Sequence, residues 1–317
     1  MTDTIDVTTA PVDRPLRVDL APRQMLWRRF RRHKAGMVAL IVMTVLVLFA
    51  VFGPLLWQVD YALTDFNAIG ESPSADHPLG TDSLGRDILI RLMIGGRVSL
   101  SVALISQILA IAFGTLLGLI AGYTNKHADT WIMRVIDVIM AIPDLLLLIL
   151  LIPVLSGALE SSWTPAWAVT LNDISLGTFG LVVGIFLITW TFVARLVRGQ
   201  VLTLREMEFV ESAVNIGVPR PLIMYRHLLP NLSTILVVAA TLGVPRGVLL
   251  EAGISFLGLG VSPPLPSWGT MISDGLSVMR SEPHILLAPA IVLSITVLCL
   301  NLLGDAIRDA VDPRSST

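Results

Sequence analysis

Six apolar stretches, each long enough to cross a lipid bilayer, limit what this chain can fold into more than any other feature of its sequence. A transmembrane helix needs ~20 apolar residues to cross ~30 Å of hydrocarbon. The six stretches lie at 36–57, 98–121, 132–155, 177–197, 229–250 and 284–304. The sequence therefore predicts an all-α integral membrane protein with six transmembrane helices.

The composition agrees with this class of protein. Only 15% of the residues are charged, whereas soluble domains carry roughly 25%. The net charge of -2 argues against nucleic acid as a partner. Cys299 is the single cysteine, so no disulfide can form within the chain. The first stretch is too long for a signal-peptide core and lacks a clear cleavage site, so we expect it to remain as an anchor.

The positions of the basic residues predict the orientation of the chain. Residues 23–34 carry six of them beside Leu26, Trp27 and Phe30, which fits either a short amphipathic helix on the inner membrane surface or an ordinary charged flank. Either arrangement leaves the amino terminus in the cytoplasm, and six crossings return the carboxyl terminus to the same side. The loop at 156–176 has no Lys or Arg, as expected of an external segment.

This orientation divides the chain into four regions. Residues 1–35 are expected to form a cytoplasmic tail with a basic interfacial helix, and 36–57 the first span. Residues 58–97 are expected to form an external loop. The core of five spans then covers 98–314 and includes a cytoplasmic loop at 205–230.

The cytoplasmic loop at 205–230 has the pattern of two short helices around a turn. Helical spacing places four small or apolar residues on one face of the first helix, namely Val210, Ala213, Val214 and Gly217. Gly217 is suited to the left-handed geometry that ends a helix. Pro219 prevents simple continuation, and Pro221 suits the first turn of the second helix.

The external loop contains the string HPLGTDSLGRD at 77–87. From Arg86 onward the pattern becomes amphipathic, which predicts a helix lying on the outer surface. His77, Asp82 and Asp87 have no spacing that metal ligation requires, so we expect turn residues there and no metal site.

Ionisable residues also occur inside two of the apolar stretches. Such groups are costly at membrane depth and usually face a cavity or a partner. Asp144, Arg246 and Glu251 are therefore candidates for the wall of a substrate path, with the alternative that Glu251 already lies in the outer interface. Pro143 and Pro153 predict a kink in the third span.

Three glycines recur four residues apart in the second span, at Gly114, Gly118 and Gly122. Such a ridge lets two helix backbones approach closely in lipid. The spacing does not decide whether the neighbouring helix belongs to this subunit or to another one.

The motifs of common enzyme classes are absent from the sequence. It contains no GxxxxGK[ST] phosphate-binding loop, so the chain is not expected to hydrolyse ATP alone. It also contains no HExxH, CxxC or GxSxG motif. A membrane enzyme would have to rely on scattered His and Asp residues, and we therefore expect a protein without catalytic residues.

Several strings resemble one family. In the loop at 205–230, five residues stand at the spacing of the EAA loop of ABC importer permeases: Glu211, Ala213, Gly217, Leu229 and Pro230. Ser212 replaces the second motif residue, and His227 stands where the general motif has Ile. The string at 77–87 is similar to the external signature of the dipeptide, oligopeptide and nickel branch, through Gly80, Thr81, Asp82, Gly85, Arg86 and Asp87. The segments at 255–269 and 302–314 resemble the same branch.

The resemblance implies a C-type permease subunit with the type I ABC importer fold, located in the bacterial cytoplasmic membrane. Its implied partners are a homologous second permease, two ATPase subunits and an external substrate-binding protein. The chain itself would bind no cofactor, because ATP and Mg would be held by the ATPases. The helix that carries Glu211 would lie in a groove of one ATPase and transmit its motion.

The implied substrates are dipeptides or oligopeptides. The same signatures leave nickel, glutathione or another small solute as alternatives. A secondary transporter is a more distant alternative, since it would show an inverted repeat and paired broken helices, and no repeat is visible in this sequence.

Overall fold

The computed structural model describes residues 22–159 and 178–311. The predictions for residues 1–21, for most of the 156–176 loop and for residues 312–314 lie outside these ranges. Within them the regular structure is helical, and no strand is present beyond an isolated bridge between Thr81 and Asp87. The prediction of an all-α protein is confirmed for the described residues.

Within each of the two described ranges the helices follow one another with short connections, apart from the external loop and the segment after α11. In chain order they are α1 (Pro22–Arg32), α2 (Lys34–Leu56), α3 (Ile88–Tyr123), α4 (Lys126–Met140), α5 (Asp144–Leu159), α7 (Phe179–Leu204), α8 (Glu208–Asn215), α9 (Arg220–Ile223), η1 (Met224–Leu228), α10 (Leu229–Asn231), α11 (Ser233–Phe256), α12 (Trp268–Leu276) and α13 (Pro283–Val311).

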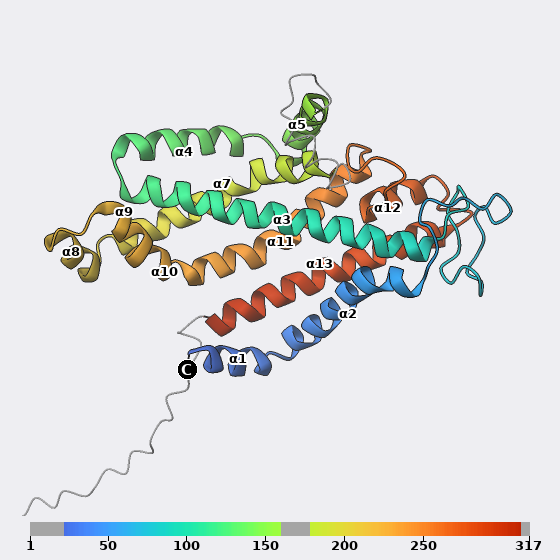
Figure 1. Ribbon diagram of the computed structural model, residues 1–317, viewed down its shortest axis with the longest axis horizontal. Helices are drawn as coiled ribbons and strands as arrows, with labels where there is room; N and C mark the ends of the chain where they lie inside the picture. The colour runs from blue at the N-terminus through green and yellow to red at the C-terminus, as the bar shows by residue number, and fades with distance from the viewer. Residues whose placement is uncertain (1–21, 160–177, 312–317) are drawn as a thin grey trace, which may run out of the picture.

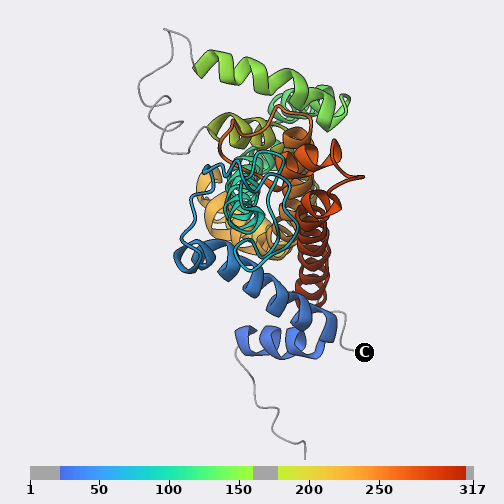
Figure 2. The ribbon, with the colours of Figure 1, turned by 90° about the vertical axis from the view of Figure 1, so that its right-hand side faces the viewer.

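The long helices run side by side, with α3 at the centre of the bundle (Figure 1). It packs mainly against α7 and also against α11 and α2. The end-on view shows α1 and α2 on one side of this centre and α4 and α5 on the other (Figure 2). Helices α8, α9 and α10 gather at one end of the bundle, while residues 58–87 and α12 lie at the opposite end (Figure 1).

Within the described residues, five helices are long and apolar enough to cross a membrane: α2, α3, α7, α11 and α13. Helices α4 and α5 pass the same test only as a pair, and they meet at 95°. The predicted count of six spans therefore holds if this bent pair is one crossing. Pro143 lies at the break, where its ring and missing N–H disfavour a continuous helix. The kink expected in the third span is this sharp break at Pro143, whereas Pro153 lies inside α5.

The expected helix on the outer surface does not exist as a separate element. Instead α3 begins at Ile88 and continues without interruption to Tyr123. Asp87 caps its start by accepting a hydrogen bond from Ile90 N at 3.0 Å. Its 36 residues correspond to about 54 Å of helix at 1.5 Å per residue. The helix is thus longer than the ~30 Å hydrocarbon layer, so part of it must extend beyond that layer.

The glycine ridge of α3 packs against α7 of the same chain. A Cβ at Gly114 would lie 2.7 Å from Trp190 O, and one at Gly118 would lie 2.7 Å from Ala194 O. A Cβ at Gly122 would meet Val201 at 2.7 Å. The ridge is therefore a packing contact within this subunit. The glycine spacing alone did not decide between a helix of this subunit and one of another subunit.

A proline in α2 is compensated by an arginine from α3. Pro54 has no N–H, so it cannot bond to the carbonyl of Ala50 four residues earlier. Arg97 Nε donates to Ala50 O at 2.6 Å, and Arg97 Nη2 donates to Val51 O at 2.5 Å. An intrahelical hydrogen bond is thus replaced by a bond between two helices.

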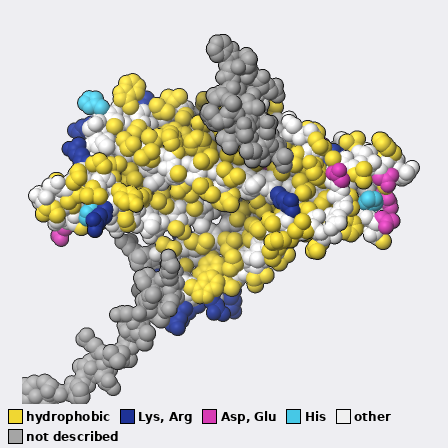
Figure 3. Space-filling model, in the orientation of Figure 1, with side chains coloured by type: hydrophobic (Ala, Val, Ile, Leu, Met, Phe, Trp, Pro, Cys, Tyr) yellow, Lys and Arg dark blue, Asp and Glu magenta, His cyan; other side chains and the backbone are white. Residues whose placement is uncertain are grey.

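Charge and hydrophobicity are separated along the long axis of the molecule. Hydrophobic side chains cover much of the flank, whereas Lys and Arg gather near α8 and α1, and Asp and Glu gather at the opposite end (Figure 3). The exposed apolar residues of α2, including Val38, Ile41 and Leu56, are of the kind that lipid would cover.

We expect Gly118→Ala to lower the thermal unfolding midpoint in detergent, because the added methyl group would press on the backbone of α7. Overpacking of this kind costs ~1–3 kcal/mol. The matched control is Gly199→Ala, since nothing lies within 4 Å of a Cβ at that glycine of α7. The control should be neutral or stabilising by ~0.5–1 kcal/mol. Equal midpoints for the two variants would contradict the assigned packing.

Candidate functional site

The first helix of the 205–230 loop is α8, and it ends in a complete Schellman motif. Gly217 has a φ of 79°, as its predicted role at the helix stop requires. Gly217 N donates to Val214 O at 2.9 Å, and Val218 N donates to Ala213 O at 3.0 Å. Nothing lies within 4 Å of a Cβ at Gly217, so backbone geometry alone requires glycine there.

The second half of the loop is divided into short helical pieces. Pro219 caps α9, and Pro221 lies in its first turn, as predicted. A single π-helical turn, η1, follows and leads into α10. Leu228 in this turn is fully buried, whereas Pro230 is exposed and Leu229 is half-buried. This turn widens the backbone spiral just before α11 begins.

The buried face of α8 is narrower than the sequence predicted. Val210 and Ala213 are buried in a cluster with Val201 and Leu204 of α7. Val214 was expected on this face, but it is 52% exposed. An eight-residue helix presents only about two turns, so only this pair of its side chains is buried in the cluster.

The outward face of α8 carries both charge and apolar surface. Glu211 and Ser212 are exposed. Large apolar side chains on the loop are also exposed, namely Met207, Phe209, Val214, Ile216, Leu222 and Tyr225. An exposed apolar patch of this kind, rimmed by charge, is typical of a surface that binds another protein.

The loop is tied to the spans at its base. Arg205 Nη1 donates to Gly122 O at 3.4 Å, which links the end of α7 to the end of α3. Arg198 of α7 forms a two-point ion pair with Asp129 of α4, in which Nη2 and Oδ2 are 2.7 Å apart. The base of the loop is therefore next to the ends of α3, α4 and α7, which these polar contacts hold together.

Two of the three residues predicted for a substrate path lie together. Arg246 of α11 and Asp144 at the start of α5 form an ion pair, and both side chains are partly exposed. Glu251 lies apart from them. It is fully buried and accepts a hydrogen bond from Ser255 Oγ at 2.7 Å. In this conformation Glu251 therefore contributes to packing inside the subunit.

The external signature forms a compact, hydrogen-bonded loop at the start of α3. Thr81 Oγ1 donates to Ala68 O and accepts from Glu71 N. Gly80 and Gly85 adopt positive φ angles of 79° and 72°. Asp87, the cap of α3, also lies 2.9 Å from His77 Nδ1 through its Oδ2 atom. The signature residues are thus held by one another, and no group of His, Cys, Asp or Glu within the described ranges could hold a metal ion.

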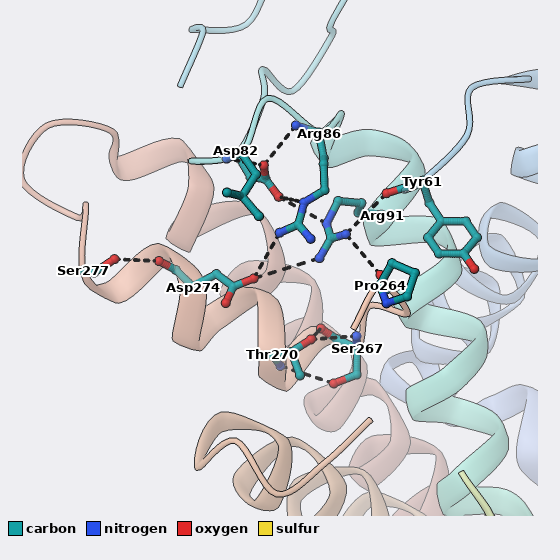
Figure 4. Close-up of polar contacts among 10 residues, drawn as sticks. Tyr61, Asp82, Arg86, Arg91, Pro264, Ser267, Thr270, Asp274 and Ser277 are labelled. Carbon is teal, nitrogen blue, oxygen red and sulfur yellow. Dashed lines mark hydrogen bonds and ion pairs between the residues drawn. The ribbon is translucent and has the colours of Figure 1, made fainter. Parts of the chain in front are cut away.

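Asp82 lies beside two buried arginines (Figure 4). Its Oδ2 atom is 2.7 Å from Arg86 Nε and 3.4 Å from Arg91 Nε. Its Oδ1 atom accepts from the backbone N–H groups of Leu84 and Arg86. The carboxylate therefore fixes both guanidinium groups against the start of α3.

Asp274 of α12 completes this group of four charged side chains (Figure 4). Partial burial raises the pKa of the Asp274 carboxyl, a rise that Arg91 and Arg86 oppose and Asp82 reinforces. Sequence reasoning missed Arg91 and Asp274. No local pattern marks Arg91 as buried, and none links Asp274 to a loop almost two hundred residues earlier in the chain.

Two family descriptions match the chain. Residues 114–317 match the binding-protein-dependent transport system inner membrane component. Residues 21–73 match the N-terminal TM domain of oligopeptide transport permease C. Together they leave uncovered residues 74–87 of the external loop and the part of α3 that precedes Gly114.

Curated relatives of similar length support these matches. The oligopeptide transport system permease protein OppC of Haemophilus influenzae is 36% identical, over 90% of this chain and 87% of that protein. OppC of Bacillus subtilis is 36% identical over 91% of this chain and 90% of that protein. The glutathione transport system permease protein GsiD of Pectobacterium atrosepticum is 35% identical over 97% of this chain and 96% of that protein.

A solved structure shares the fold. It is a chain of the MetNI methionine ABC transporter in an inward-facing conformation, with a TM-score of 0.54 and 21% identity. The match covers 70% of this chain and 96% of that chain. At this identity the likeness concerns the fold, and it agrees with the predicted type I permease architecture.

We expect Asp82→Asn to lower the thermal unfolding midpoint clearly, because it leaves two buried arginines without their shared carboxylate. Breaking a buried ion pair on one side costs ~3–5 kcal/mol. Asp76→Asn is the matched control, since Asp76 is exposed in the same loop and should have little effect. An unchanged midpoint for Asp82→Asn would contradict its role as the anchor.

Asp274→Asn should behave differently from Asp82→Asn. The folded protein binds a proton on Asp274 more readily than the unfolded chain does, because the pKa is raised. This group's contribution to stability is thus present below the ordinary aspartate pKa of about 3.9 and is lost as the pH rises through the raised value. Asp274→Asn should remove that pH dependence and leave the midpoint at neutral pH equal or higher. A marked loss of stability at neutral pH would contradict this sign.

Proposed function

The chain belongs to the family of binding-protein-dependent transport system inner membrane components, and from that premise we propose that it is the permease subunit that couples ATP hydrolysis to the import of short peptides. The observation that carries this proposal is the geometry of α8. It is a short helix that projects from the ends of the spans, with two residues anchored inward and a mixed apolar and acidic face turned outward.

The proposed orientation places α8 and both termini in the cytoplasm of a bacterium and residues 58–87 outside. The separation of charge supports it, since the basic side chains gather at the α8 end (Figure 3) and positively charged segments remain inside. The basic helix α1 lies beside the carboxyl-terminal end of α13, which puts both ends of the described chain on that side (Figure 1).

The proposed partners are two ATPase subunits, an external substrate-binding protein and a second, homologous permease. ATP and Mg would be bound by the ATPases. The exposed residues of α8, including Glu211 and Ile216, would enter a groove of one ATPase as a helix-in-groove ligand. Displacement of this helix would pass through Val210 and Ala213 into the buried cluster that they share with Val201 and Leu204 of α7.

The proposed substrates are peptides of a few residues. Relatives named for oligopeptide, dipeptide and glutathione transport match at 35–36% identity. Glutathione is itself a tripeptide, so these names describe one chemical class. Nickel or another small solute remains the alternative, and family membership sets aside the secondary transporter.

The proposed path is lined by Arg246 and Asp144. A charged side chain that faces hydrocarbon at the middle of the membrane costs ~2.5–3.5 kcal/mol of insertion free energy. An ion pair facing lipid would therefore be unfavourable. Both side chains are partly exposed within the apolar part of the chain, which favours a position toward the second permease or the aqueous path. Glu251 is not included, because its side chain is buried in this conformation.

We expect Gly217→Val to give an inserted subunit that co-purifies with its permease partner but couples poorly to the ATPases. A side chain at a left-handed position costs ~1–2 kcal/mol, which disrupts the end of α8 without touching the spans. Glu211→Lys should act in the same direction by reversing the charge of the exposed face. The measurement is substrate-stimulated ATP hydrolysis by the reconstituted complex, together with the yield of co-purified ATPases.

Gly258→Val is the control for backbone strain. Gly258 has a φ of 78° and open space around its Cβ position, as Gly217 does, but it lies at the opposite end of the molecule. It should leave the yield of co-purified ATPases unchanged. Normal stimulation and yield in both loop variants would reject this loop as the element that transmits the motion.

The double substitution Asp144→Asn with Arg246→Leu should leave insertion and assembly intact and change uptake. It removes both charges together, so neither is left alone at membrane depth. We expect the ratio between uptake of a lysine-containing and a glutamate-containing tripeptide to shift in proteoliposomes with the same ATPase content. An unchanged ratio with an unchanged rate would show that the pair does not line the path.

A further inference from the structure

A small cavity of about 280 Å³ opens at the end of the molecule that carries the external loop. It lies between the start of α3, helix α12 and the segment that follows α11. Charged, hydroxyl and apolar groups all reach it, among them Arg86, Arg91, Asp274, Ser273, Thr270 and Pro264. No step of the proposed transport function uses this cavity.

Two guanidinium groups are held side by side in the cavity wall. Asp82 binds the Nε side of both arginines, at 2.7 Å from Arg86 and 3.4 Å from Arg91. Arg91 Nη1 also donates to the carbonyls of Tyr61 and Pro264, at 3.3 and 3.4 Å. The side chain of Arg91 is only 4% exposed. These contacts leave the Nη2 atoms of both arginines directed toward Asp274 (Figure 4).

Asp274 holds its place between the two Nη2 atoms loosely. Its Oδ2 atom is 3.5 Å from Arg86 Nη2 and 3.9 Å from Arg91 Nη2, and both distances exceed those of charge-assisted hydrogen bonds. Its side chain is 44% exposed, so it can turn toward solvent. An anion position built by two fixed arginines is thus occupied by a carboxylate that has poor hydrogen-bond geometry.

We propose that this cavity is a binding site for a carboxylate group of an extended polypeptide, and that Asp274 occupies the anion position until such a group displaces it. Without Asp274 the cavity wall has two positive charges from Arg86 and Arg91, and Asp82, bound to both arginines, adds one negative charge. A single net positive charge suits a monoanion such as a carboxylate better than a doubly charged phosphate. The two Nη2 atoms, one from each arginine, can each donate a charge-assisted hydrogen bond to a carboxylate, and the volume admits a chain end or one side chain.

The carboxylate has two possible sources, which the experiment separates. It is either the C-terminus of a peptide or an acidic side chain of a protein that docks on this end. That this end faces outward rests on the proposed function. Binding at the cavity does not require the ATPases or α8, so it can fail or succeed independently of the coupling test.

The test uses the full-length chain, co-purified with its partner permease and ATPases in lipid nanodiscs, without the substrate-binding protein. Three blocked tripeptides are titrated by microscale thermophoresis. They are N-acetyl-trialanine with a free C-terminal acid, its carboxamide, and N-acetyl-Ala-Glu-Ala carboxamide. The variant is Asp274→Asn, whose polar side chain keeps its size, and the matched control is Asp76→Asn, which removes an exposed negative charge from the same loop.

We expect Asp274→Asn to bind at least one acidic tripeptide about tenfold more tightly than the unsubstituted chain, which corresponds to ~1.4 kcal/mol. Asp76→Asn should show no such gain, and the neutral carboxamide should bind neither protein. If only the free-acid tripeptide binds Asp274→Asn more tightly, the site is assigned to a peptide C-terminus. If only the glutamate tripeptide binds more tightly, the site is assigned to an acidic side chain. If both bind more tightly, the site recognises a carboxylate from either source.

Arg86→Gln is the complementary variant and should abolish binding of the acidic tripeptides. If it does not fold, the Asp274→Asn comparison decides alone. Equal binding of acid and carboxamide forms would overturn the proposal, as would the same gain in Asp76→Asn. Absence of any gain for both acidic tripeptides in Asp274→Asn would overturn it as well.

Discussion

The close packing of α3 against α7 is the contact on which the rest of the molecule depends. In lipid there is no hydrophobic force between helices, so association rests on close packing and on polar contacts. Gly114, Gly118 and Gly122 remove the side chains that would keep the two backbones apart. Around this pair, α11 and α2 pack against α3, α5 packs against α7, and α4 packs against both.

The same pair carries the cytoplasmic loop. Val201 contacts the ridge at Gly122 and also belongs to the cluster that buries Val210 and Ala213 of α8. One side chain thus links the packing of the spans to the packing of the loop. Any force applied to α8 would reach the centre of the bundle through tightly packed atoms, and such contacts move as a unit because protein interiors have few voids.

Much of this arrangement could be predicted from the sequence, and the parts that could not be predicted share a physical reason. The positive φ of Gly217 and the break at Pro143 follow from local backbone chemistry, which a sequence displays directly. The ion pair of Asp144 with Arg246 joins residues 102 positions apart, and Asp274 meets Arg91 only because α12 folds back onto α3. The exposure of Val214 was also missed, because helical spacing gives the direction of a face but not its width.

The bond between Arg97 and the carbonyls of α2 has a mechanical consequence. Helix α2 buries few side chains inside this subunit, so packing alone resists its sliding only weakly. Because Arg97 binds Ala50 and Val51 at one level of that helix, α2 can neither rotate about its axis nor shift by a turn without losing both bonds. These two bonds hold α2 in register with α3, so a movement of α3 that preserves them carries α2 with it.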